Sequence, residues 1–179
     1  MKILKDYGIH RVTYALLKPA FLTEREAIID ATRTLDLALE HSDLVILFPC
    51  RVYPYTLNDL LMKHKRYRPP WIWSILEVLR KFGKGDLKRI KVTGWETPPP
   101  TKIHSFNCPK CSKELVNLLK AWKRTHDYSY LREAFNFSCE CKDTWKEIVR
   151  LAPDYHLEER VILELKQVRN LFMNEVCKY

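Results

Sequence analysis

Apolar side chains alternate with polar or small ones over residues 10–18, a period of two that predicts a β-strand. Residues 44–48 are all apolar, which is typical of a strand covered on both faces in a parallel sheet. Between the two, Thr23-Glu24-Arg25-Glu26 has the pattern of a capping box, and apolar residues at helical spacing follow it, so we expect a helix over 24–40. Strand, helix and strand together predict a parallel βαβ unit.

Weaker patterns continue this alternation of helices and strands. A short helix is expected over 56–63 and another over 70–82, where Pro70 suits the first turn. A third strand is expected over 89–95. The proline run in residues 97–101 favours polyproline geometry, so we place a domain boundary there.

Beyond this boundary the pattern is mainly helical. Ser112 precedes a helix with apolar residues on one side, a short helix is expected over 145–151, and a longer one over 157–176. The last helix can pack on its own domain or on another copy, and we expect self-packing because apolar stripes usually face a core. The chain is therefore expected to form two units, residues 1–96 and 97–179.

Four of the six cysteines occur as two closely spaced pairs. Cys108-Pro-Lys-Cys111 and Cys139-Glu-Cys141 are separated by 27 residues. Each pair can chelate from one tight turn, and four thiolates complete a tetrahedron around zinc. Because the protein would then fill every position, such a site is structural. An iron–sulfur cluster stays an alternative, as do four unrelated buried cysteines.

Other residues could contribute to this site, or to none. His104 and His126 lie close enough in sequence to replace a ligand, although a lone histidine is more often a surface or hydrogen-bonded residue. Cys50 and Cys177 have no partner at ligand spacing and are expected to be inert thiols.

The amino-terminal residues and the hydropathy of the chain indicate the cellular compartment. The first residues lack the features of a secretion signal, and no stretch approaches the roughly 18 apolar residues of a membrane span. We therefore expect a cytoplasmic protein without membrane contact, in which cysteines are thiols or metal ligands rather than disulfides.

The formal charge is +9, and most of the excess lies in one segment. Residues 63–91 contain ten basic residues against two acidic ones, with Trp71 and Trp73 interleaved. Cations neutralise phosphates and exposed rings stack on bases, so nucleic acid is the favoured partner. The alternative is a solvated face with Trp71 or Trp73 in the core. The residues assigned to RNA binding are Lys63, Lys65, Arg66, Arg68, Arg80, Lys81, Lys88 and Arg89.

The ends of the first two predicted strands carry polar side chains. Lys18 and Pro19 follow the first strand, and Cys50 and Arg51 follow the second. Parallel α/β folds bind ligands at the carboxyl ends of their strands, so Lys18, Cys50 and Arg51 are candidates for a cofactor pocket. The alternative is that Lys18 only solvates the strand end.

Four motifs, in this order, resemble a known family. They are Leu16-Leu-Lys-Pro-Ala-Phe-Leu-Thr-Glu-Arg-Glu-Ala27, Phe48-Pro-Cys-Arg-Val52, Tyr67-Arg-Pro-Pro-Trp-Ile-Trp-Ser74 and the two cysteine pairs. From about residue 8 to 150 the chain resembles the C-terminal half of the radical S-adenosylmethionine subunit of archaeosine synthase. The resemblance implies an archaeal source, a tRNA substrate, and an α/β fold in which a partial (β/α) barrel precedes a small, mainly helical zinc-binding domain.

The resemblance also implies S-adenosylmethionine and a [4Fe–4S] cluster held by a C-x3-C-x2-C loop. The sequence contains no such loop, and a complete barrel needs roughly 200 residues or more. We therefore expect no radical chemistry from this chain alone. It is either a component that needs a cluster-bearing partner chain, a zinc-containing RNA-binding module or remnant, or an interaction protein that uses its last helix and an uncovered strand edge.

Overall fold

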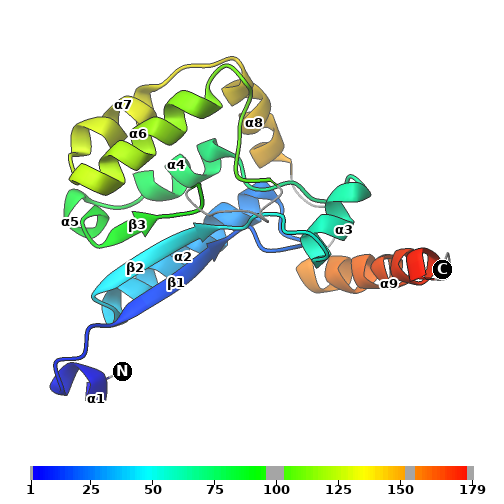
Figure 1. Ribbon diagram of the computed structural model, residues 1–179, viewed down its shortest axis with the longest axis horizontal. Helices are drawn as coiled ribbons and strands as arrows, with labels where there is room; N and C mark the ends of the chain where they lie inside the picture. Colours follow the sequence, from blue (N-terminus) through cyan, green and yellow to red (C-terminus); the bar gives the residue numbers. More distant parts are fainter. Residues whose placement is uncertain (1, 96–102, 152–155, 177–179) are drawn as a thin grey trace.

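The computed structural model describes residues 2–95, 103–151 and 156–176, without the side chains of 2, 5 and 171–176. The proline run expected as a domain boundary lies outside the described residues, as does Cys177. Three parallel strands form one sheet in the order β1-β2-β3: β1 spans Val12–Leu17, β2 Leu44–Pro49 and β3 Ile90–Val92 (Figure 1). The mixed α/β class is therefore confirmed.

The βαβ unit at the start of this sheet is confirmed. Helix α2 (Glu24–His41) connects β1 to β2 and begins with the expected capping box, in which Thr23 and Glu26 exchange side-chain and backbone hydrogen bonds. Its buried stripe packs on both strands, since Ala27, Ala31 and Leu35 are completely buried. Local sequence and tertiary packing agree here.

The other expected helices are α3 (Leu57–Lys63), α4 (Ile72–Arg80), α6 (Ser112–Thr125), α8 (Cys141–Arg150) and α9 (Leu157–Val176). The ends of α3 and α9 are as predicted, with Thr56 as the N-cap of α3, whereas those of α4 and α8 are shifted. The strand expected over 89–95 is confined to the three residues of β3, and the helix expected over 145–151 begins four residues earlier, at Cys141. Three short helices were not expected: α1 (Lys2–Asp6), α5 (Lys84–Leu87) and α7 (Tyr128–Asn136).

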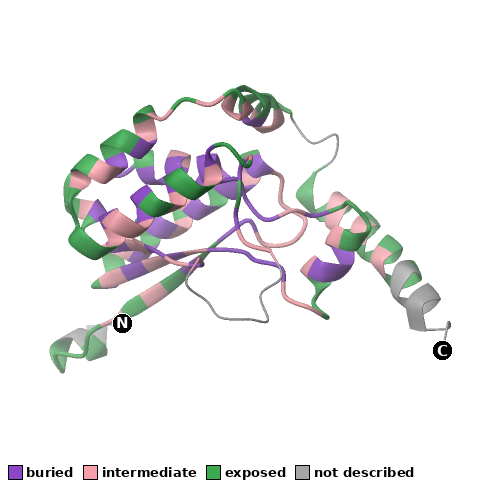
Figure 2. Cartoon of the chain, turned by 45° about the horizontal axis from the view of Figure 1, so that its top comes forward, coloured by how far each residue is buried: buried purple, intermediate pink, exposed green. Residues whose placement is uncertain are grey.

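One hydrophobic core joins the parts of the chain on either side of the proline run. It contains Leu17 and Leu47 of the sheet, Ile75 of α4, and Leu115 and Trp145 of α6 and α8. Helices α2, α4 and α6 contact one another or the sheet, and α7 packs on α4 and α6. Figure 2 shows this continuous buried interior beneath the helices.

The two faces of the sheet differ in burial, contrary to what the apolar run of β2 predicted. Side chains at 45 and 47 are completely buried, whereas those at 44, 46 and 48 are only partly buried. The expectation that β2 is covered on both faces is therefore wrong for the described residues, because the helices that pack on the sheet cover one face.

Helix α9 packs on its own chain through one side, but its main contacts are with residues of the first expected unit, 1–96, rather than with its own unit. Arg160 contacts Glu26 at 2.6 Å, Glu164 contacts Arg66 at 3.0 Å, and Val168 packs against a second, smaller core around Leu61. Its other side carries exposed apolar residues, which are Leu157, Ile162, Leu163 and Leu165.

Candidate metal centre and surrounding basic surface

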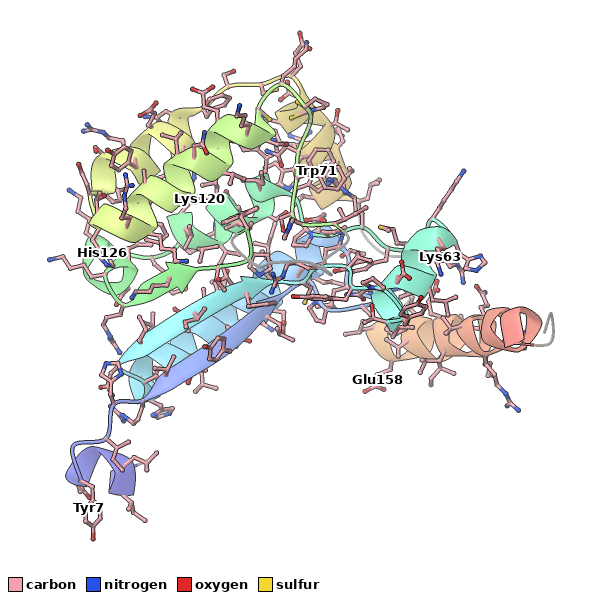
Figure 3. The ribbon with its side chains drawn as sticks, in the orientation of Figure 1. Tyr7, Lys63, Trp71, Lys120, His126 and Glu158 are labelled. Carbon is pink, nitrogen blue, oxygen red and sulfur yellow. The ribbon has the colours of Figure 1, made fainter. Side chains whose placement is uncertain are left out.

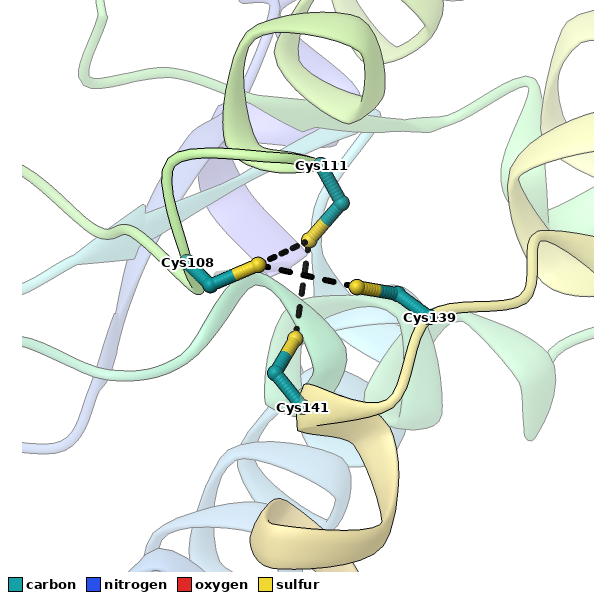
Figure 4. A group of neighbouring side chains, drawn as sticks. All are labelled: Cys108, Cys111, Cys139 and Cys141. Atoms are coloured by element: carbon teal, nitrogen blue, oxygen red, sulfur yellow. Dashed lines mark hydrogen bonds between the residues drawn. The ribbon is translucent and has the colours of Figure 1, made fainter.

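The four paired cysteines converge on one point from two tight turns (Figure 4). The amides of Cys111 and Ser112 both donate to the carbonyl of Cys108, which closes the first turn at the start of α6. The second turn is closed by the amide of Lys142, which donates to the carbonyl of Cys139 at 2.8 Å and leads into α8. Each pair is thus held by a turn and a helix start, so the thiols are fixed without long loops.

The sulfur atoms lie at the spacing that a single metal ion requires. Cys108 Sγ is 3.6 Å from Cys111 Sγ and 3.5 Å from Cys139 Sγ, and Cys111 Sγ is 3.6 Å from Cys141 Sγ. Four sulfurs at zinc bonds of about 2.3 Å form a tetrahedron with edges of about 3.8 Å. In an iron–sulfur cluster the four thiolates are divided among two or more iron atoms, so they do not all lie within 4.8 Å of one another as these do. The geometry therefore favours a mononuclear site, and these four residues could hold one metal ion.

The electrostatics of the thiols also fit a cation. Burial raises the pKa of Cys141 to about 12, and it raises the pKa of Cys111. Burial opposes ionisation of Cys108 as well, but hydrogen bonds from the Cys111 amide and the neighbouring thiols outweigh it and lower that pKa to about 7. Four neighbouring thiols cannot all ionise unless a positive charge offsets the repulsion between the thiolates. A bound divalent cation supplies that charge and deprotonates the thiols that coordinate it.

Two side chains outside the cysteines connect this site to α4. Trp73 donates through Nε1 to Cys141 Sγ at 3.3 Å, and the ammonium of Lys142 lies 4.9 Å from the centre of the Trp73 ring. Asn107 Oδ1 accepts from the amides of Ile72 and Trp73, at 2.8 and 3.3 Å, and so caps the helix. Neither role was predicted from the sequence, and no local pattern marks them, because each contact spans more than 30 residues.

The candidate histidine ligands lie elsewhere. The metal-binding group consists of the four cysteines alone among the described residues. His126 ends α6 in a left-handed conformation, with φ of 58°, and lies far along that helix in Figure 3. His104 is half-buried near Gly94.

At the carboxyl end of β1, Lys18 belongs to a buried ion pair. Its Nζ contacts Glu24 at 2.6 Å and the carbonyl of Arg68 at 3.1 Å. Burial lowers the pKa of Lys18. Glu24 also accepts a short hydrogen bond from Ser74, whose hydroxyl accepts from Trp145 Nε1 at 2.9 Å. This network joins the end of β1 to α2, α4 and α8, so Lys18 helps to hold these elements together.

Cys50 and Arg51 are also buried at this end of the sheet. Burial raises the pKa of the Cys50 thiol to about 11, so it is protonated at neutral pH. The Arg51 guanidinium lies over the rings of Phe48 and Tyr53, at 4.4 and 5.2 Å, and donates to the carbonyl of Gly94. The cofactor role predicted for Lys18, Cys50 and Arg51 stays a prediction.

A cavity of about 500 Å³ opens beside the Lys18 network. The basic side chains in its wall are Lys18, Lys65, Arg66, Arg68 and Arg160, against Glu24 and Glu164. Trp71 Nε1 and two guanidinium nitrogens of Arg160 are buried there without a hydrogen-bond partner among the described residues. The cavity is therefore rich in cations and donors.

The residues assigned to RNA binding divide between two ends of the sheet. Lys63, on α3 in Figure 3, lies on the same side as the cavity, which Lys65, Arg66 and Arg68 help to form. Arg68 also stacks between Trp71 and Phe106, at 3.9 and 4.4 Å, so Trp71 is a core residue that a cation covers.

The others lie toward the amino end of the strands. Arg80 donates to the carbonyl of Phe135, Lys81 pairs with Glu77 at 3.1 Å, and Arg89, next to the exposed Lys88, donates to two carbonyls at the end of α2. A further basic hollow that the sequence analysis missed lies on α6, lined by Lys120, Lys123 and Arg124.

None of the helices that the structure describes combines the length and the hydropathy that a bilayer crossing requires.

Comparison with known proteins identifies three relatives. The chain is 34% identical over 147 residues to the archaeosine synthase subunit beta of Methanosarcina acetivorans, and this match covers 82% of the chain and 41% of the relative. It is 32% identical over 149 residues to the protein of the same name from Thermococcus kodakarensis, a match that covers 83% of the chain and 45% of the relative. It is 29% identical over 176 residues to an uncharacterized protein of Methanocaldococcus jannaschii, a match that covers 97% of the chain and 45% of the relative. No family model and no solved structure matches the chain.

The matches cover most of this chain but less than half the length of each relative. Two relatives from different organisms carry the same name, and both are more than 30% identical to the chain. The chain is therefore a homologue of the proteins named archaeosine synthase subunit beta, and it corresponds to a part of their length.

Proposed function

We propose that this chain is a component of a tRNA-modifying enzyme that forms archaeosine, in which it supplies a zinc-stapled RNA-contacting body. The homology to two proteins named archaeosine synthase subunit beta carries the proposal. The word subunit in both names points to a further chain in the active assembly. The three parallel strands would then be the last units of a (β/α) barrel, continued by residues outside this chain.

In this proposal the metal is zinc and its role is structural. Four thiolates would leave no position for water or substrate, so the ion would hold α6, α8 and the start of α4 together. Because four of the six cysteines serve this site, the chain would not itself supply a C-x3-C-x2-C loop for a radical-generating cluster. Radical chemistry would require a cluster-bearing partner.

The metal assignment is tested on the purified chain. We expect one equivalent of zinc per chain by elemental analysis, and none in Cys108→Ser. Anaerobic treatment with iron and sulfide should produce no absorbance near 400 nm. A stable chromophore there that disappears in Cys108→Ser would overturn the assignment to zinc.

We propose that tRNA lies against the basic residues around the cavity at the carboxyl end of β1. Lys63 and Lys65 suit this role because they are exposed, and the five basic side chains in the cavity wall against two acidic ones favour an anionic ligand in the cavity. Phosphate contacts release counterions, so affinity should fall steeply with salt.

Filter binding of unmodified tRNA at several salt concentrations tests this interface. Replacing Lys63 and Lys65 together by alanine should weaken binding and reduce the salt slope by about two, roughly one per phosphate contact. Lys110→Ala is the matched control, because Lys110 is also exposed and, like Lys63, has a carboxylate 3.5 Å away, but lies beside the metal centre. A salt slope that is the same in the double variant and the wild type would contradict the interface.

The alternative function is a non-catalytic RNA-binding module, which the basic residues around the cavity would equally support. The two differ in a reconstituted reaction. A component of the enzyme should be required for conversion of precursor tRNA when a cluster-bearing partner and S-adenosylmethionine are supplied, whereas a module should bind tRNA without affecting conversion.

A further inference from the structure

The sheet has an apolar face that the described helices leave uncovered. The register of the parallel strands places Val12 beside Leu44, Tyr14 beside Ile46, and Leu16 beside Phe48, so these six side chains share one face. Val12, Tyr14 and Leu16 are 43%, 64% and 50% exposed. We call this set the open face.

On the opposite face of the sheet, two side chains of β1 are fully buried. Ala15 and Leu17, which alternate with the exposed residues, are 1% and 0% exposed beneath α2 and its neighbours. Parallel sheets occur almost only with both faces covered. An exposed face with two aromatic rings and several aliphatic side chains therefore indicates a surface that another body covers.

The edge of the sheet is open on the same side. In the order β1-β2-β3, β1 pairs with β2 alone within the described residues, so its outer edge presents free amides and carbonyls. The segment that leads into β1 is apolar and exposed too. Ile3, Tyr7 and Ile9 are 70%, 80% and 50% exposed, and α1 projects away from the body in Figures 1 and 3.

The chemistry of this surface selects its occupant. RNA is a poor fit, because the open face carries Lys91 as its one basic side chain among the strand residues described. Further parallel strands fit well, since the first would pair with the β1 edge and the following ones, curving round as in a barrel, would cover the apolar side chains. The relatives contain enough polypeptide for this, because more than half of each lies outside the match.

We infer that the open face and the β1 edge bind a β/α polypeptide equivalent to the part of the relatives that lies outside the match. A strand of that polypeptide pairs parallel with β1, and the strands that follow it pack on Val12, Tyr14 and Leu16. This deepens the proposed function, on which it rests, by naming the surface through which the partner acts.

Co-expression tests the inference with defined probes. The chain is produced with the unmatched portion of the M. acetivorans, the T. kodakarensis or the M. jannaschii relative. We expect at least one portion to co-elute with the chain at one to one. Hydrogen exchange at the β1 amides should slow at least tenfold in that complex.

A matched pair of variants makes the result specific. Tyr14→Lys places a charge on the open face and should abolish co-elution. Leu37→Lys should not, because Leu37 is 61% exposed on α2, which covers the other face. Circular dichroism and zinc content should be the same in both variants and the wild type.

Three outcomes would overturn the inference: no portion co-elutes, Tyr14→Lys co-elutes as well as the wild type, or the chain alone dimerises through this face and Tyr14→Lys makes it monomeric. The tRNA affinity of Tyr14→Lys is measured separately and should be unchanged. If Tyr14→Lys loses co-elution but still binds tRNA, the change acts on the docking surface alone. If the wild-type chain does not bind tRNA, the proposed function is contradicted and the docking surface is not.

Discussion

Replacing Asn107 by alanine should show that the metal-bearing segment and α4 form one cooperative structure. Asn107 is 4% exposed, and its Oδ1 accepts from the amides of Ile72 and Trp73 at the first turn of α4. The N-cap residue of α4, Trp71, makes no side-chain hydrogen bond to these amides. Alanine therefore leaves two buried amides without an acceptor.

The expected loss follows from those two bonds. Removing a helix cap costs about 1 kcal/mol, and leaving a second buried donor unsatisfied costs about 1–3 kcal/mol. We expect Asn107→Ala to lower the free energy of unfolding by about 2–4 kcal/mol. For a chain of this size each kcal/mol corresponds to a fall in Tm of about 2–4 °C.

Urea unfolding followed by tryptophan fluorescence, at saturating zinc, measures the change. Asn107→Asp keeps the acceptor and should lose less than half as much as the alanine variant. Asn117→Ala on the exposed side of α6 controls for loss of an amide side chain. If Asn107→Ala is no less stable than Asn117→Ala, the cap contributes nothing and the coupling to α4 is refuted.

Three further predictions concern the metal centre and α9. Trp73→Phe removes the hydrogen bond to Cys141 Sγ but keeps an aromatic ring, so zinc affinity in a chelator competition should fall about tenfold or more, with Trp95→Phe unchanged as the control. Chelation of the metal should lower Tm and expose the buried tryptophans, and a chain whose Tm ignores chelators would contradict a structural metal. Burial raises the pKa of Glu26, but hydrogen bonds from Arg160 and Thr23 outweigh this and hold it below its ordinary value of 4.5. The contact of Glu26 with Arg160 therefore contributes its full stability at pH values above 4.5, the pKa of Glu26 in the unfolded chain. This stability is lost as the pH falls through the lower pKa that Glu26 has in the folded chain. The protection factors of the α9 amides, which compare each exchange rate with that of an unstructured chain at the same pH, should fall in acid. Glu26→Gln should show the same low protection at neutral pH; protection equal to that of the wild type would argue against this anchor.

Local sequence was sufficient where neighbours along the chain make the contacts. Thr23 and Glu26 lie one turn apart, so the capping box could be read before the fold was known. The cysteine pairs could be read in the same way, because each chelates from a single turn. The helix over 128–136 was missed since its buried stripe is only two residues, Leu131 and Ala134.

Tertiary structure decided the roles of the charged residues. The cations of 63–91 lie in one segment of the sequence, but α4 and β3 carry them to different ends of the sheet. Lys18 lies in the cavity wall, as its position at a strand end predicted, but its ion pair with Glu24 is buried because distant residues pack on it, the Arg68 carbonyl on Lys18 and Ser74 on Glu24.

The sequence by itself therefore determined the α/β class, the first βαβ unit and the group of four cysteines that could hold a metal ion, because these depend on period, capping and spacing over a few residues. Only the tertiary structure decided that Asn107 caps α4, that Trp73 supports Cys141, and that Val12, Tyr14 and Leu16 are left uncovered. Those features depend on contacts, or on their absence among the described residues, between segments far apart in the chain. The hydrophobicity of β1 is the same whether its second face is covered or open, so sequence pattern alone cannot distinguish the two.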